Sequence, residues 1–123
     1  MQHEDQHIRI AKWLEDIRDS AAFIISTRSH MNAQQFCEDR LVRQAIERNF
    51  QIIGEALRRL DRHFPEIAQK IECLPRIISF RNIIVHAYDG IDPLLMWQIV
   101  QDDTPKLLGN VESLLTELGF GRS

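Results

Sequence analysis

One segment of the chain brings an arginine, an amide, a histidine and a phenol together within eight residues. It runs from Arg81 to Tyr88 with the sequence RNIIVHAY, and Tyr88 is the single tyrosine of the chain. Three consecutive branched apolar residues separate the amide from the histidine. Polar groups in so apolar a setting are typical of a binding or active site cut into a helical core. We therefore treat residues 81–88 as the candidate segment.

The histidine and the arginine of this segment could together cleave RNA without a metal ion. Histidine transfers protons near neutral pH, so His86 could take the proton of a 2′-hydroxyl group or protonate the leaving 5′-oxygen. Arginine is a permanent cation that binds phosphate, so Arg81 could offset the charge that develops on the phosphorus centre. A structural role stays open, since a single histidine at a helix end often only caps the helix.

The spacing within the segment decides which of these groups can meet. On a regular helix Asn82 and His86 share a face, whereas Arg81 and His86 lie about 140° apart around the axis. Three arrangements would still join Arg81 and His86. The long arginine side chain could reach round, the helix could distort or end near His86, or a two-fold axis could bring two copies of the segment together.

The elements that position the segment are expected to be helices. Apolar residues recur at three- and four-residue steps over much of the chain, and no stretch alternates as a strand would. The sequence therefore predicts an all-α fold, an up-and-down four-helix bundle with a short extra helix. The expected helices span residues 5–29, 39–63, 74–88 and 93–118, with the short helix over 65–71 and a connector of about one turn over 31–37.

Caps and helix breakers support these boundaries. Aspartate favours the N-cap position and proline the first helical turn. The expected caps are Asp5, Asp39 and Asp92, and the expected first-turn prolines are Pro65, Pro75 and Pro93.

The last helix contains a proline in its interior. Pro105 either kinks this helix or divides it, and in the second case Thr104 could cap the new start. Gly119 is expected to end the helix.

Four further residues of the expected helices bear on the site. Gly54 lies in a helix interior, where glycine costs roughly 1 kcal/mol relative to alanine, and a close approach by another helix would explain it. Asn49 and Glu55 lie near the buried side of the same helix. Asn49 is interpreted as a satisfied structural residue, whereas Glu55 could be structural or could orient a site residue. Trp13 is expected in the core or at a dimer interface.

The composition is typical of a soluble globular protein. The chain has 123 residues, of which 44% are hydrophobic and 27% charged, and we expect one domain over residues 1–123. No stretch has the apolar length of a membrane span, and the N-terminus is polar and acidic, unlike a signal peptide. Cys37 and Cys73 lack metal-binding spacing and are expected to be reduced thiols, which together predicts a cytoplasmic location.

The charge of the chain is unevenly distributed. The net charge of −3 argues against a general nucleic-acid binder. Residues 40–81, however, carry nine basic and five acidic side chains, whereas the segments before and after carry net charges of −3 and −4. The middle third could form a local phosphate-binding surface, or its arginines could simply be solvated. No acidic cluster, HExxH pattern or glycine-rich loop suggests a metal, a nucleotide or another cofactor.

The candidate segment fits the pattern R-N-x-x-x-H-x-Y and resembles the signature of the HEPN superfamily, the higher eukaryote and prokaryote nucleotide-binding domains. More narrowly, it is similar to HepT, the toxin half of the MNT–HEPN (MntA–HepT) toxin–antitoxin pairs. The flanking stretches 48–56, 74–75 and 88–92 also resemble this family. The likeness therefore extends over most of the chain.

The resemblance implies an all-α homodimer with two copies of the motif lining one cleft, and a metal-independent endoribonuclease activity. Carried over to this sequence, Arg81 and His86 would be catalytic and Asn82 would support the site. The partner would be an MntA-like nucleotidyltransferase antitoxin that transfers AMP from ATP to Tyr88. An adenylate on Tyr88 would place a bulky anion beside Arg81 and His86, where it could compete with RNA.

Two other functions stay open at this point. The chain could be a non-catalytic regulatory subunit of a nucleotidyltransferase that binds a nucleotide or the partner, or it could be a purely structural helical dimer. A nucleotidyltransferase encoded next to this chain would fit both the toxin and the regulatory subunit. Ribonuclease activity therefore separates them.

Overall fold

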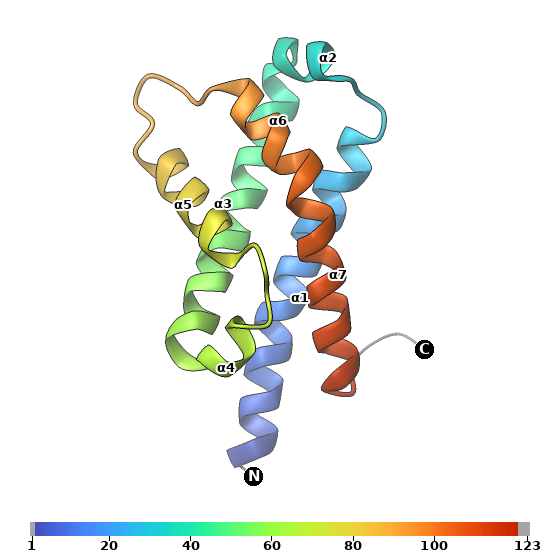
Figure 1. Cartoon of the computed structure of the whole chain (residues 1–123), viewed down its shortest axis with the longest axis vertical. Helices are drawn as coiled ribbons and strands as arrows, with labels where there is room; N and C mark the ends of the chain where they lie inside the picture. The colour runs from blue at the N-terminus through green and yellow to red at the C-terminus, as the bar shows by residue number, and fades with distance from the viewer. Residues whose placement is uncertain (1, 121–123) are drawn as a thin grey trace.

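The computed structural model describes residues 2–120, and within this range every regular element is a helix (Figure 1). The predicted all-α class is confirmed. The helices are α1 (Gln2–Arg28), α2 (Ala33–Glu38), α3 (Arg40–His63), α4 (Pro65–Ala68), α5 (Leu74–Val85), α6 (Pro93–Asp102) and α7 (Thr104–Glu117).

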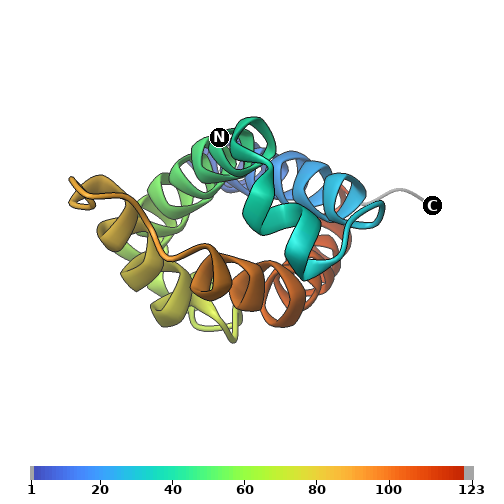
Figure 2. The ribbon, with the colours of Figure 1, turned by 90° about the horizontal axis from the view of Figure 1, so that it is seen from above.

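The long helices form an up-and-down bundle. α1 runs alongside α3 and α7, and α5 packs against α3. Seen from above, α1, α3, α5 and the α6–α7 pair surround a common interior (Figure 2). The four main helices that the sequence predicts are therefore present, with the fourth made of two pieces.

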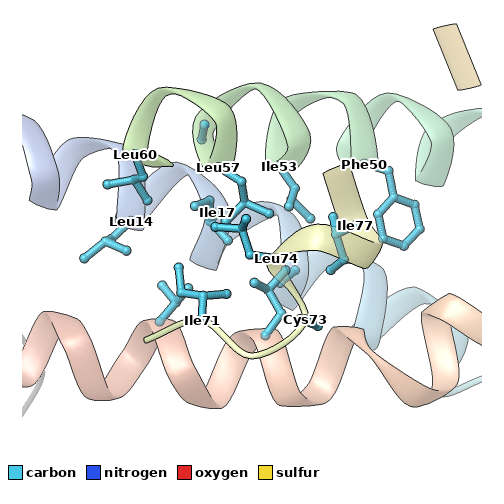
Figure 3. Packing of buried hydrophobic residues seen from close by; sticks show 14 of the residues in the cluster. Leu14, Ile17, Phe50, Ile53, Leu57, Leu60, Ile71, Cys73, Leu74 and Ile77 are labelled. Atoms are coloured by element: carbon cyan, nitrogen blue, oxygen red, sulfur yellow. The ribbon is translucent and has the colours of Figure 1, made fainter. Parts of the chain in front are cut away.

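The interior is filled with branched and aromatic side chains from all of these helices. Figure 3 shows part of this core, in which Leu14 and Ile17 of α1 face Ile53 and Leu57 of α3. Near one end of the core, α3 and α5 are joined by two phenylalanines. The rings of Phe50 and Phe80 meet edge to face with their centroids 5.2 Å apart. Because such a pair contributes about 0.5–1.5 kcal/mol beyond its buried area, it holds α5 firmly on α3 directly before the candidate segment.

Two of the three predicted aspartate caps are confirmed. The carboxylates of Asp39 and Asp92 each accept a hydrogen bond from a first-turn backbone N–H, at N···O distances of 3.1 and 3.0 Å. The prediction for Asp5 is wrong, because α1 already begins at Gln2. Asp5 instead lies in the first turn, where a negative charge interacts favourably with the helix dipole.

Pro105 divides the last predicted helix instead of kinking it. α6 ends at Asp102 and α7 begins at Thr104. Thr104 is not the cap of α7, because Asp103 occupies that position and the Thr104 hydroxyl donates to the carbonyl of Ile99 at 3.1 Å. The threonine thus closes the end of α6, a local bond that this side chain often makes.

The shorter segments differ slightly from their predicted extents. The connector forms α2, which starts with a reciprocal pair of hydrogen bonds between Asn32 and Gln35. α4 ends at Ala68, three residues earlier than predicted. Gly119 follows the last helix with a φ of +85°, as expected of a glycine that ends a helix. No helix in the described part of the chain combines the length and the apolar character needed to cross a bilayer.

Cys73 is expected to resist alkylation in the folded protein. Burial, and to a smaller extent the nearby Asp103 carboxylate, raise the pKa of Cys73 to about 11, and only the thiolate is nucleophilic. Cys37 is also a free thiol but only half-buried. Iodoacetamide at about pH 8 should therefore label Cys37 first, and Cys73 only in urea. Mass spectrometry measures both rates, and equal labelling of Cys73 with and without urea would contradict its burial.

Candidate functional site

The candidate segment lies at the end of α5 and in the turn that follows it. α5 ends at Val85, three residues earlier than predicted, and His86 takes the C-cap position with φ −104° and ψ 9°. The backbone N–H of His86 still donates to the carbonyl of Asn82 at 3.2 Å. Of the three arrangements considered above, the structure therefore shows an end of the helix near His86. The direction of the histidine is no longer fixed by the regular helical rotation of about 100° per residue.

Arg81 is held against the backbone of α3. A Cβ atom built on Gly54 would lie 2.4 Å from Cγ and 2.5 Å from Cβ of Arg81, which is closer than real atoms approach. The absence of a side chain at Gly54 thus creates the space that the stem of the arginine fills. The predicted close approach of another helix at Gly54 is confirmed, and that helix is α5.

The guanidinium of Arg81 is oriented by a carboxylate of α3. Its Nη2 lies 3.4 Å from Oε2 of Glu55, and Oε1 of the same carboxylate lies 3.4 Å from Nε of Arg59. The Arg81 side chain is only 20% exposed, whereas that of Glu55 is 44% exposed. An ion pair this exposed contributes little to stability, so the contact mainly sets the direction of Arg81. Of the two interpretations left open for Glu55, the orienting one has a direct contact behind it.

The remaining donors of Arg81 are only partly used. Nη1 donates to Oδ1 of Asn82 at 3.3 Å, and Nε is buried without a hydrogen-bond partner within the described residues. An unpaired buried donor is costly, but this atom has almost no accessible surface, so a ligand cannot reach it while Arg81 keeps this position. Asn49, by contrast, donates to the carbonyl of Ala45 at 2.8 Å, so its structural interpretation is confirmed.

His86 and Tyr88 face solvent. Both are exposed, and Tyr88 is 91% exposed, on a turn in which Gly90 adopts a φ of +95°. Within residues 2–120 no hydrogen bond or ion pair joins Arg81 to His86. One chain therefore brings Arg81 and Asn82 together but presents His86 separately.

Large apolar side chains are also exposed around the candidate segment. Ile83 and Val85 are 47% and 45% exposed, and Leu94, at the start of α6, is 57% exposed. Contact with a partner would remove these apolar side chains from water. In the part of the chain that the structure covers, no three histidine, cysteine or acidic side chains are grouped so that they could hold a metal ion.

The role of Arg59 escaped the sequence analysis. Glu55 and Arg59 are four residues apart on one helix, a spacing at which opposite charges meet, so this pair could have been found. The contact between Glu55 and Arg81 could not, because it joins residues 26 apart in the sequence.

The comparisons with known proteins identify relatives over almost the whole chain. A family model described as "Ribonuclease HepT-like" matches residues 14–114, which include the entire candidate segment. "Putative RNase MJ1380" of Methanocaldococcus jannaschii is 35% identical over 105 residues, covering 84% of this chain and 94% of that protein. "Probable ribonuclease HepT" of Thermococcus cleftensis is 29% identical over 102 residues, covering 83% of this chain and 92% of that protein. No solved structure matches the chain significantly.

Proposed function

The chain belongs to the HepT-like ribonuclease family, and from this premise we propose that it is the toxin of a type VII-like toxin–antitoxin pair. In this proposal residues 1–123 act as one HEPN-like domain that cleaves RNA without a metal ion. The observation that carries it is the fixed guanidinium of Arg81, whose stem is seated on Gly54, whose direction is set by Glu55 and whose side chain is 20% exposed. The names of the relatives as ribonucleases support the cleavage of RNA.

The proposed reaction is an internal transfer of the phosphate ester. The 2′-oxygen of a ribose attacks the adjacent phosphorus, and the bond to the 5′-oxygen of the next nucleotide breaks. His86 takes the proton of the 2′-hydroxyl group or gives one to the leaving oxygen. Arg81 binds the phosphate oxygens and offsets their growing charge, and Asn82 holds its guanidinium. The products are a 2′,3′-cyclic phosphate and a 5′-hydroxyl group.

A second copy of the chain would complete this site. The reaction needs one proton removed and one supplied, and a single chain offers one histidine in the candidate segment. In a homodimer, two copies of His86 would line one cleft, so that one could act as base and the other as acid. The exposed Ile83, Val85 and Leu94 support such pairing, since contact with a second copy would cover them.

The activity is tested by incubating the purified, unmodified protein with a mixed RNA pool in excess EDTA. Cleavage is expected, because the proposed groups need no metal. If the dimer is intact, its mass shows no adenylate and no RNA is cut, the assignment is wrong. A non-catalytic regulatory subunit of a nucleotidyltransferase would then explain the family membership better.

Tyr88→Phe should abolish silencing by the partner without abolishing cleavage. The proposed antitoxin is an MntA-like nucleotidyltransferase that binds ATP. In its active site the phenol oxygen of Tyr88 would attack the α-phosphorus of ATP, and pyrophosphate would leave. Tyr88 is suited to this transfer because 91% of the residue is exposed. The added phosphate would compete with RNA for Arg81. Incubation with partner and ATP, followed by mass spectrometry, checks it, and an adenylate that persists on the phenylalanine variant would overturn this role.

A further inference from the structure

A basic groove runs along the second half of α3, beside the ion pair of Arg81. It encloses about 740 Å³ and is bounded by Trp13 of α1 and Ile78 of α5. All of its charged lining residues come from positions 55–62 of α3. Glu55 belongs both to this groove and to the contact that orients Arg81. Glu55 therefore links the groove to Arg81 of the candidate site.

The cations of this groove outnumber its acids. Arg58, Arg59 and Arg62 line it, against the carboxylates of Glu55 and Asp61. All three arginines are exposed, and among the described residues no carboxylate lies within 4.0 Å of Arg58 or Arg62. Two guanidinium groups thus face solvent unpaired, on a protein whose net charge is −3. Such a local concentration of charge attracts an anionic ligand.

α1 forms one edge of the groove, and aromatic and cationic side chains meet there. The rings of Trp13 and His63 lie 5.8 Å apart, and the guanidinium carbon of Arg9 lies 5.2 Å from the centre of the Trp13 ring. Trp13 is thus packed partly on the core, as the sequence predicted, and partly under a cation.

We propose that this α3 groove, built on Arg58, Arg59 and Arg62, binds the phosphate backbone of the RNA strand that enters the site at Arg81. The inference rests on the proposed ribonuclease function and adds a binding subsite to it. Residues 55 and 62 are seven positions apart, which corresponds to about 10 Å along the helix axis. A stretch of this length can contact more than one phosphate of an RNA strand. Contacts to phosphate carry no base information, so the groove would fix the path of the strand without selecting its sequence.

An RNA strand explains the groove better than an acidic protein partner does. The groove is connected to the site through the carboxylate of Glu55. This carboxylate lies between Arg59 in the groove and Arg81 in the site. The regularly spaced phosphates of a strand could contact Arg59 and Arg81 on either side of this single carboxylate, and also the unpaired Arg58 and Arg62.

The test compares two doubly substituted proteins in a His86→Ala background, in which RNA is bound but not cut. Arg58→Gln with Arg62→Gln removes the two unpaired cations of the groove. Arg40→Gln with Lys106→Gln removes the same charge from exposed positions outside it. Binding of a labelled single-stranded RNA of about 12 nucleotides is measured by fluorescence anisotropy at several salt concentrations.

The groove variant should bind RNA about tenfold more weakly, and its salt dependence should fall by about 1.4 in the slope of log K against log salt concentration. The outside variant should keep both values close to those of the His86→Ala parent. Equal weakening in both variants would show only an effect of net charge and would overturn the proposal. Unchanged RNA binding by the groove variant would also overturn the proposal. If that variant loses binding to the nucleotidyltransferase partner instead, the groove is a protein-docking surface and the RNA proposal is equally wrong.

This outcome is separate from the fate of the proposed function. If the wild type cuts RNA in EDTA but the groove variant binds as well as its parent, the groove proposal fails and the ribonuclease stands. If the wild type does not cut RNA but the groove variant alone binds it more weakly, the ribonuclease proposal fails and the groove proposal stands.

Discussion

His86→Ala should reduce the rate of RNA cleavage by about 10²- to 10⁴-fold, the contribution that a positioned acid or base typically makes. Arg81→Ala should cost about 10²- to 10³-fold, as expected when one donor to the developing charge is removed. Both losses should appear in kcat, because His86 transfers a proton and Arg81 stabilises the growing phosphate charge in the transition state. Arg81→Lys should restore only part of the rate, since an ammonium group keeps the charge but not the planar fork that can contact Glu55 and a phosphate together.

The structure provides the control for this comparison. His86 is exposed at the end of α5, so its replacement should leave the folded protein intact. Arg81 is largely buried on α3, so thermal melting must accompany the kinetics of its variants. His30→Ala changes another exposed histidine far from the candidate segment in sequence, and it should cleave like the wild type. If the variants of His86 and Arg81 both cut at the wild-type rate, the assigned site is wrong.

Gly54→Ala should lower both stability and cleavage, although alanine is the better helix former. The new Cβ would lie 2.4 Å from Cγ and 2.5 Å from Cβ of Arg81. Because the Cβ of Arg81 is fixed to the backbone of α5, a change of rotamer cannot relieve the clash. The whole of α5 must therefore shift on α3. Overpacking of this kind costs about 1–3 kcal/mol. The shift would also break the alignment of Arg81 with Glu55, so cleavage should fall even where the protein remains folded.

Gly109→Ala is the matched control for this prediction. Gly109 also lies inside a helix, but apart from its chain neighbours and the backbone of its own helix, no atom of the described residues lies within 4 Å of the position its Cβ would take. Alanine there should therefore stabilise the protein by up to about 1 kcal/mol and leave cleavage unchanged. Urea unfolding and RNA cleavage measure both effects. A Gly54→Ala protein as stable and as active as the Gly109→Ala protein would contradict the close packing of Arg81 on α3.

Much of the helical framework could be predicted from local signals. Asp39 and Asp92 act as the expected caps because capping depends on a few neighbouring backbone groups. The end of α5 was misjudged because the sequence marks a stop only at Asp89-Gly90, whereas the helix already ends at Val85. Three consecutive β-branched residues before that point favour the helix only weakly, so the packing of the bundle decides the boundary.

The site was predicted less completely than the fold. The residues of the candidate segment follow from their types and spacing, and the unusual glycine at position 54 indicates a close approach. The identity of the approaching group, Arg81, depends on how α5 lies against α3. The α3 groove is further out of reach, because Trp13 and Ile78 meet the arginines of α3 only in the folded chain.

The most direct test of the account is the chemistry of the cleaved ends. The unmodified wild-type protein would be incubated with an end-labelled RNA in excess EDTA, and the product termini would be identified by mass spectrometry. The account predicts 2′,3′-cyclic phosphate and 5′-hydroxyl ends, together with no cleavage of DNA of the same sequence. Products with 3′-hydroxyl and 5′-phosphate ends, or equal cleavage of DNA, would show that water and not the 2′-oxygen attacks the phosphorus, and would contradict the roles proposed for Arg81 and His86.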